Sequence, residues 1–429
     1  MSVEPGFSFR SIALPALLPT LLFSIGEGAI IPVIPVAADN LGASLAVSAV
    51  IASMIMLGQL FGDVPSGWIV ARIGERNAMI YAALLAIAGL VTALVAPNPL
   101  LLGAGILLVG LATAVFALAR HAFMTSFVPI AYRARALSTL GGTFRLGYFV
   151  GPFVSSALIH LTGSTQSVFW VHIVCSLAAA ALLFALRDPA EVLAASRASS
   201  GGRSGQAEGS GRAGGSGRRE GEELVAGESH GLFRTVWTSR AVLLRLGTGA
   251  ALVSALRASR QVILPVWAVS LGIPDAQTAL IIGVAGAIDF ALFYASGQIM
   301  DRFGRIWTGV PSMIGLGLGH LILAFSHDLS GAYGWFLVAA ALMSVANGIG
   351  SGINMTMGAD LADPRNPAPF LGAWRFTADA GSAVAPLALS GLTALLSLAA
   401  ASGVMGLVGF AGAAVLLRYI PRYVARTRR

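Results

Sequence analysis

The sequence predicts an all-α membrane protein of twelve transmembrane helices, arranged as two parallel six-helix repeats. Of its 429 residues, 56% are hydrophobic and only 11% are charged, and the mean hydropathy is +0.81. Its apolar runs are long enough to cross a bilayer, because a helix rises about 1.5 Å per residue and the hydrocarbon core is about 30 Å thick. Identical residues also recur at a fixed offset of 230 positions, for example Gly74 and Gly304.

Twelve apolar runs follow one another along the chain. They cover residues 12–38, 45–70, 77–97, 99–126, 136–162, 167–187, 243–271, 276–300, 306–327, 332–359, 369–394 and 397–418. The alternating segments of about ten residues that are typical of β-barrels are not seen, so we expect helices. The first run is too long for a cleaved signal peptide and contains Glu27, Pro32 and Pro35. We therefore expect it to remain as the first span.

The fixed offset relates the first half of the chain to the second. Identical residues or opposite charges stand at Glu27 and Arg257, Pro35 and Pro265, Gly42 and Gly272, Gly67 and Gly297, Arg72 and Arg302, Gly74 and Gly304, Gly142 and Gly372, Arg145 and Arg375, and Gly151 and Gly381. Such a repeat indicates an internal duplication. Because six spans is an even number, both copies enter the membrane in the same orientation. In secondary transporters with this arrangement, the substrate lies between the halves near the midplane.

The distribution of arginine predicts the topology. All 27 basic residues are Arg. Most of those outside the spans follow the even-numbered spans or end the chain, as at Arg133, Arg135 and Arg422, whereas the loops after odd-numbered spans carry few charges. The positive-inside rule then predicts a multi-pass protein of the cell (inner) membrane with both termini in the cytoplasm. The pI near 10.5 follows from this topology, so we expect the lipid bilayer and no nucleic acid as a partner.

The chain divides into three parts. We expect six-helix bundles at residues 1–187 and 243–429, joined by a cytoplasmic linker at 188–242. Most of the linker is Gly, Ser, Arg and Glu, a composition that cannot bury enough apolar surface to fold. Its arginines could also hold it to anionic lipid. Cys175 stands alone inside span six and is expected in the core, so we predict no metal site and no cofactor, and we expect a monomer.

A short motif occurs after span two and again after span eight. Its small residues permit close helix approach and a tight turn, and its charges stand at helix ends. The residues are Gly67, Arg72, Gly74 and Arg76 in the first copy, and Gly297, Asp301, Arg302, Gly304 and Arg305 in the second. Through them the chain resembles the major facilitator superfamily over essentially its whole length outside the linker. The resemblance implies charge contacts that hold the outward-facing state, although Ala71 and Glu75 depart from the pattern.

Span five carries a second resemblance. Gly147, Gly151 and Pro152 match a motif of the drug:proton antiporter branch of that superfamily, whereas Ser155 and Ser156 replace its last two glycines. The resemblance implies export by antiport. Ordinary small-residue packing with a proline kink would produce the same pattern.

Nine charged residues lie inside the predicted spans. They are Glu27, Asp63, Arg120, Arg145, Arg257, Arg260, Asp289, Arg375 and Asp379. One charge near the bilayer centre costs about 2.5–3.5 kcal/mol, so these side chains must face one another or a wet cavity. The uncharged spans three, six, nine and twelve then lie outside. This division agrees with the resemblance, which implies that spans one, four, seven and ten line the cavity and that two, five, eight and eleven form the interface between halves.

The depths of these charges suggest three groups, each of which could also be a purely structural ion pair. Glu27 and Arg257 lie near the midplane, with Asp289 close enough for Arg257 or Arg260. The second group, nearer the cytoplasm, comprises Asp63, Arg120 and Arg145. The third comprises Arg375 and Asp379, which are one helical turn apart and can pair directly.

Proton coupling needs a group that changes charge, which arginine cannot do. The candidates are Glu27, Asp63, Asp289, Asp379 and His121. Glu27 leads, because burial would favour proton uptake and pairing with Arg257 in one conformation would oppose it.

Span ten carries no charge but has a polar stripe. Asn347, Ser351 and Asn354 are spaced for one helical face, which suits either a substrate-lining surface or close helix packing. The candidate substrate-binding residues are Glu27, Arg257, Arg260, Gln261, Asp289, Asn347, Asn354, Arg120, Arg145 and Arg375.

The chain lacks a phosphate-binding loop, an H-E-x-x-H motif and a soluble domain large enough for a catalytic site, so we do not expect an enzyme. The first hypothesis is a secondary active transporter that exports small lipophilic compounds by proton antiport and alternating access. The second is uptake or exchange of an organic anion bound by the intramembrane arginines. The third is a non-transporting sensor or assembly partner.

Overall fold

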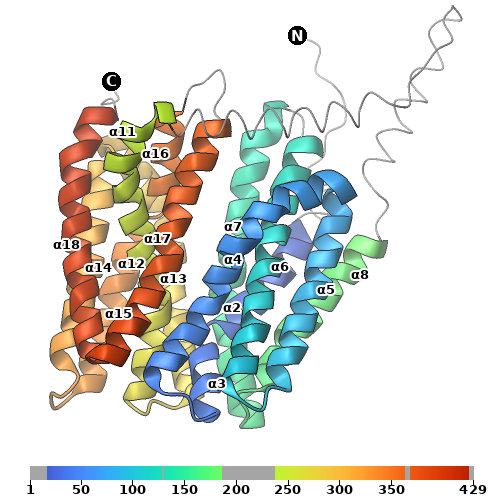
Figure 1. The fold of residues 1–429 in the computed structure, drawn as a ribbon, viewed down its shortest axis with the longest axis vertical. Coiled ribbons are helices and arrows are strands. Elements are labelled where there is room, and N and C mark those ends of the chain that lie inside the picture. Colours follow the sequence, from blue (N-terminus) through green and yellow to red (C-terminus); the bar gives the residue numbers. More distant parts are fainter. Residues whose placement is uncertain (1–16, 128–129, 186–236, 363–367, 425–429) are drawn as a thin grey trace, which may run out of the picture.

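A computed structural model describes residues 17–127, 130–185, 237–362 and 368–424. Every regular element in these residues is a helix, and the helices lie roughly side by side as two bundles (Figure 1). The first bundle, called the N half, contains α2 (Leu18–Ile30), α3 (Ile34–Asn40), α4 (Leu45–Ile73), α5 (Glu75–Leu94), α6 (Pro99–Phe127), α7 (Ile130–Thr162) and α8 (Ser167–Ala185).

The second bundle, called the C half, begins before residue 243. It contains α11 (Arg240–Val242), the π-helix η2 (Leu243–Gly247), α12 (Thr248–Ser270), α13 (Asp275–Phe303), α14 (Ile306–Ser326), α15 (Ala332–Ile349), α16 (Ile353–Leu361), α17 (Ala368–Leu395) and α18 (Leu398–Tyr423). We call the end of the molecule with the turns at Gly74 and Gly304 the motif end. The other end, with the turns at Gly42 and Gly272, is the far end.

The predicted spans appear as helices, with two of them broken. Among the described residues, ten helices are long and apolar enough to cross a membrane, and the bent pair α2 and α3 makes an eleventh. The remaining predicted span is α7, which has 33 residues. The bend between α2 and α3 is 41° and occurs where Pro32 and Pro35 interrupt the run, since proline lacks the N–H that continues a helix. Span ten is divided into α15 and α16.

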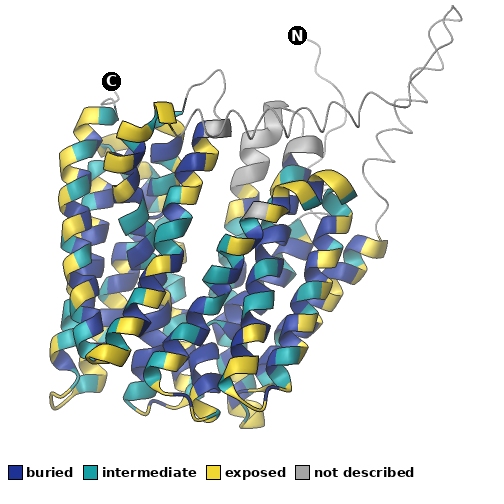
Figure 2. Ribbon diagram, in the orientation of Figure 1, coloured by how far each residue is buried: buried dark blue, intermediate teal, exposed yellow. Residues whose placement is uncertain are grey.

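The packing of the helices confirms the predicted interface. α7 packs on α13, and α4 packs on α17, so spans two, five, eight and eleven join the halves. α5 and α8 pack together within the N half, and α14 and α18 within the C half. Buried residues face the interior and exposed residues cover the outer helix faces (Figure 2), as expected for helices that present apolar side chains to lipid.

At the far end, hydrogen bonds cross between the halves. Ser156 on α7 donates to the carbonyl oxygen of Ala276 on α13 at 2.7 Å, and Thr165 donates to the carboxylate of Asp275. The other side of the interface has the same kind of contact, from Ser390 to the carbonyl oxygen of Ala46 at 2.7 Å. The halves are therefore joined at the far end.

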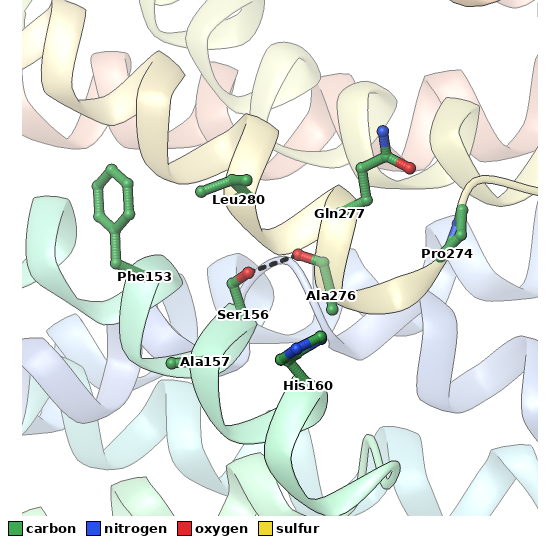
Figure 3. Close-up of a pocket in the computed structure, with 8 residues that line it drawn as sticks. All are labelled: Phe153, Ser156, Ala157, His160, Pro274, Ala276, Gln277 and Leu280. Carbon is green, nitrogen blue, oxygen red and sulfur yellow. Dashed lines mark hydrogen bonds between the residues drawn. The ribbon is translucent and has the colours of Figure 1, made fainter.

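A shallow hollow of about 550 Å³ lies beside the Ser156 contact. In Figure 3, Phe153 from α7 and Leu280 from α13 stand above the hydrogen bond, with His160 below it. The hollow marks the place where the surfaces of the two halves meet.

Candidate functional site

Glu27 on α2 is completely buried in the N half. Its Oε1 accepts a hydrogen bond from Gln59 Nε2 at 3.2 Å, and its Oε2 has no hydrogen-bond partner in the described structure. Tyr148 and Thr113 are the other polar side chains beside the carboxyl group, and Arg120 is the cation that acts on it. Glu27 thus lies in a polar cluster built from α2, α4, α6 and α7.

The predicted pairing of Glu27 with Arg257 is not formed. Arg257 on α12 instead donates a hydrogen bond from Nη2 to the carbonyl oxygen of Gly350, and its Nε is buried without a partner in the described structure. The break in span ten explains this contact, because a carbonyl freed from its helix needs another donor. Sequence spacing could not show it, since the break itself depends on neighbouring helices.

Arg260 and Asp289 form the best-defined ion pair inside the C half. Arg260 Nη1 lies 2.9 Å from Asp289 Oδ2, and Asn347 Nδ2 donates to the same oxygen at 3.1 Å. Arg260 Nη2 also donates to Ser344 Oγ at 2.7 Å. A buried charge pair needs such additional hydrogen bonds to offset the cost of leaving water. Asp289 therefore pairs with Arg260, which is one of the two arginines that the predicted depths in the membrane placed within its reach.

Arg145 reaches from the N half to the C half. Its guanidinium carbon lies 4.1 Å from the centre of the Phe293 ring on α13, one helical turn from Asp289. Arg145 and Asp289 interact electrostatically, and Arg145 and Arg257 repel each other. Neither of these arginines has a carboxylate within 4 Å among the described residues. Two cations from opposite halves thus lie near one acid that Arg260 already neutralises.

The predicted group of Asp63, Arg120 and Arg145 is wrong. Asp63 on α4 lies 3.9 Å from Arg375 on α17, across the interface, and Arg375 lies 3.3 Å from Asp379, so the predicted pairing on span eleven is confirmed. Arg120 packs over the Phe144 ring at 4.4 Å. Asp63 was predicted in a different group from Arg375, because the two residues lie far apart in the sequence. The contact between α4 and α17 brings them together.

The repeat offset relates the two crossing arginines. Arg145 corresponds to Arg375, and their partners Phe293 and Asp63 also occupy equivalent positions. One side of the interface therefore carries a cation–π contact and the other an ion pair.

The polar stripe predicted on span ten is not a single face. α15 ends at Ile349 and α16 begins at Ile353, with Gly352 at φ +81°. Asn347 contacts Asp289, whereas Asn354 beyond the break donates to Ser254 Oγ at 2.9 Å. The spacing rule failed because it assumes an unbroken helix.

The two motif loops contain the predicted tight turns. Gly74 and Gly304 have φ of +82° and +96°, a region that favours glycine. The prediction that helices approach closely at Gly67 and Gly297 is wrong for this conformation, because a Cβ at either position would meet no atom within 4 Å.

The charged residues of the two motif copies make different contacts. Arg76 donates to the carbonyl oxygens of Leu183 and Phe184 at the end of α8, at 2.8 and 2.9 Å. Arg305 holds both carboxylate oxygens of Asp360 on α16, at 2.8 and 3.1 Å.

The other charges of the motif lie at the surface. Arg72 and Arg302 each pack over an aromatic ring of their own helix, those of Trp68 and Phe303. Asp301 is exposed and makes no ion pair with any residue that the structure describes. The charge contacts implied by the resemblance are therefore absent around Asp301 in this conformation.

The glycines of the span-five motif lie against α2 within the N half. A Cβ on Gly147 would overlap Ser24, and one on Gly151 would overlap the backbone of Gly28 and Ala29. Ser155, which replaces a motif glycine, donates to the carbonyl oxygen of Ala29 at 2.6 Å. Close packing of α2 and α7 thus accounts for these residues, and Pro152 lies inside a continuous α7.

Gln261 lines a small cavity of about 20 Å³ to which α3, α4, α12 and the bend after α2 contribute. His121 Nδ1 bonds the carbonyl oxygen of Ala117 at 2.8 Å, one turn earlier on α6. Gln59, Ser344 and Asp360 were not among the residues predicted from the sequence. The first two are polar residues inside apolar spans, a signal that could have found them, whereas Asp360 gave no local signal.

Comparisons with known proteins agree with this fold. The family model of the Major Facilitator Superfamily matches residues 16–386 and 246–429. The chain belongs to the Major Facilitator Superfamily. It is therefore a multi-pass membrane protein, and members of this superfamily are transporters rather than enzymes.

Solved structures show the same Major Facilitator Superfamily fold. A peptide transporter, POT, in complex with sulfate is 15% identical, with a TM-score of 0.72 and coverage of 98% of this chain and 97% of that chain. A POT family transporter in complex with 5-aminolevulinic acid is 11% identical, with a TM-score of 0.74 and 97% coverage of both. At these identities the likeness concerns the fold alone.

Curated relatives match shorter regions. The galactose-proton symporter of Escherichia coli (strain K12) is 26% identical over 182 residues, which is 42% of this chain and 39% of the symporter. The probable anion transporter 7 of Oryza sativa subsp. japonica is 32% identical over 146 residues, 33% of each chain. This chain therefore spans about two-fifths of the symporter and a third of the anion transporter.

Proposed function

We propose that this chain is a proton-coupled secondary transporter of a small organic anion, whose acidic group binds between Arg145 and Arg257. The observation that carries the proposal is the unbalanced charge between the halves. Arg145 on α7 and Arg257 on α12 repel each other, and within the described residues neither is ion-paired to a carboxylate. Like charges in a low-dielectric interior raise the energy of the protein, and a bound anion would offset that repulsion.

The surroundings suit an organic molecule. Phe293 lies under Arg145, and Phe149 and Phe290 stack across the interface with ring centres 5.7 Å apart. These rings offer apolar contact to the body of a substrate, while the two guanidinium groups offer hydrogen bonds to a carboxylate or phosphate. An anion bound to residues of both halves would also respond to any movement of one half against the other.

We place proton coupling at Glu27, in the N half. Its carboxyl group is completely buried, and Arg120 is the nearby cation that attracts the ionised form of this group and not the protonated form. The galactose-proton symporter among the relatives supports a proton as the coupling ion. We further propose that the motif end faces the cytoplasm, as the arginine distribution predicts, that both termini lie there, and that residues 188–242 link the halves.

The test is competition for transport in proteoliposomes by three matched sets of compounds: organic anions, neutral lipophiles and organic cations. We expect only the anions to compete. Arg257→Gln and Arg145→Gln should each raise the KM for an anionic substrate by about tenfold or more, since a charge-assisted hydrogen bond is worth roughly 1.5–3 kcal/mol. Arg418→Gln, which removes an exposed arginine at the motif end, is the control and should leave KM unchanged. Competition by neutral or cationic lipophiles alone would refute the proposal.

Export of lipophilic compounds by antiport is the second candidate. The aromatic stack at the interface and the span-five motif favour it. The packing of Gly147 and Gly151 on α2 provides a structural reason for the motif that does not involve substrate, so the anion proposal has the stronger support.

A further inference from the structure

The start of span seven and the end of span twelve carry arginines and aromatic rings that the transport site does not use. Both elements lie at the motif end, next to each other (Figure 1), and η2 packs on α18. We call this surface the basic patch. It comprises Trp237, Arg240, Arg245, Arg418, Tyr419, Arg422 and Tyr423. All four of its arginines are exposed.

Contacts within the basic patch hold its side chains in place. Arg245 Nη1 donates to the hydroxyl of Tyr423 at 2.9 Å, which ties η2 to α18. Arg240 lies 4.5 Å from the centre of the Trp237 ring, and Arg422 lies 5.8 Å from that of Tyr419. Neither residues 237–258 nor residues 398–424 include an acid, so the patch contains no carboxylate of its own.

The depth of the basic patch corresponds to the lipid headgroups. α18 has 26 residues and is therefore about 39 Å long, which exceeds a hydrocarbon core of about 30 Å. Its last turns therefore reach the headgroup layer. Next to the arginines, Leu244 and Leu417 are 74% and 57% exposed, as expected for side chains in contact with acyl chains. Aromatic residues and arginine at this level are typical of the membrane interface.

We propose that the basic patch binds an anionic phospholipid, with the headgroup phosphate held by the arginines and the acyl chains lying along Leu244 and Leu417. Charge complementarity identifies the occupant, because basic side chains at a membrane surface attract anionic lipid. The site belongs to the C half alone. At the equivalent positions of the N half, Pro15 replaces Arg245 and Asp188 replaces Arg418.

The test uses the full-length protein in detergent with an equal mixture of phosphatidylglycerol and phosphatidylcholine that have the same acyl chains. Native mass spectrometry counts the lipid that remains bound. The wild-type protein should prefer phosphatidylglycerol, and the double variant Arg245→Gln with Arg422→Gln should lose that preference by about fivefold for each arginine. Arg245→Lys, which retains the charge, should keep most of it. High salt should weaken the preference.

The matched control is Arg72→Gln with Arg302→Gln, which removes the same number of exposed arginines from the motif end. This control should change the preference less than twofold. An equal loss in the control, or no preference in the wild-type protein, would overturn the proposal, because net charge alone would then explain the binding. Thermal unfolding of each variant should show an unchanged midpoint, which ties any loss of lipid to the patch rather than to misfolding.

Two further arms distinguish other occupants. Glu220→Gln, Glu222→Gln and Glu223→Gln together remove the acids that precede the patch in the chain. A tenfold rise in lipid retention in that variant would show that the linker occupies the patch and would overturn the proposal, whereas no change supports it. Displacement of the lipid by millimolar inorganic phosphate would identify a site for a free anion instead, whereas retention supports a lipid site.

Discussion

Arg145 and Arg375 show how a duplicated residue acquires different surroundings. Both cross from their own half to the other, yet Arg145 contacts the Phe293 ring and Arg375 contacts Asp63. Residue type and spacing predicted that both arginines lie inside spans and that they occupy equivalent positions of the two repeats. The partner of each charge depends on which helix of the other half lies opposite, which no local pattern contains.

Glu27 is the residue whose protonation should drive transport. Glu27→Gln retains the shape of the side chain and the contact with Gln59 but cannot release a proton. We expect accumulation driven by a pH gradient in proteoliposomes to fall below about a tenth of the wild-type rate, since a change in charge at this site is the coupling step. Exchange of substrate at equal pH on both sides should persist, because binding at the arginines is retained.

Asp39→Asn is the matched control, because Asp39 is an exposed carboxylate near the end of α3, directly after the same predicted span. It should leave gradient-driven transport unchanged. Undiminished gradient-driven transport in the Glu27→Gln variant would exclude Glu27 from coupling.

At the scale of elements, glycine marks both the turns that the sequence predicts and a break that it does not. The motif predicted tight turns at Gly74 and Gly304, and both have positive φ. The polar residues of span ten predicted either close packing or a substrate-lining face, and the structure shows instead a break at 350–352. Arg257 satisfies the freed carbonyl of Gly350, and Ser296 satisfies that of Ser351 at 2.7 Å. Donors from other helices therefore stabilise the break.

The two glycines of the second motif copy should respond differently to substitution. Gly304→Ala places a side chain at φ +96°, which should destabilise the protein by about 1–2 kcal/mol. Gly297→Ala lies inside α13 with no atom within 4 Å of the added Cβ, so it should be neutral or stabilise by up to about 1 kcal/mol. The midpoint of thermal unfolding in detergent measures both effects. Equal midpoints for the two variants would contradict the role of the turn.

For the whole molecule, the contacts at the far end define the conformation. Hydrogen bonds from Ser156 to Ala276 and from Ser390 to Ala46 join the halves there, on both sides of the interface. In a transporter that works by alternating access, these contacts must break when the far end opens. The internal duplication explains why the same kind of contact occurs on both sides.

A cross-link at the far end should stop transport. In a Cys175→Ala background, Ser156→Cys with Ala276→Cys should form a disulfide under oxidation, which fixes α7 to α13. We expect substrate transport to fall to background and to recover on reduction. The control pair is Thr162→Cys with Ser167→Cys, which lies at the same end but within the N half, where the two side-chain oxygens are 3.0 Å apart. Continued transport by the oxidised Ser156 and Ala276 pair would show that the far end does not open there.

The sequence by itself determined the helical membrane class, the spans, the duplication and the turns at Gly74 and Gly304. These depend on hydropathy and on backbone conformation, which are properties of short segments. Only the tertiary structure decided that Glu27 lies with Arg120, that Arg257 bonds a broken helix, and that Asp63 meets Arg375. Each of these contacts depends on the angle and depth at which two distant helices pack, and charges in a membrane pair with whichever partner that packing brings within reach.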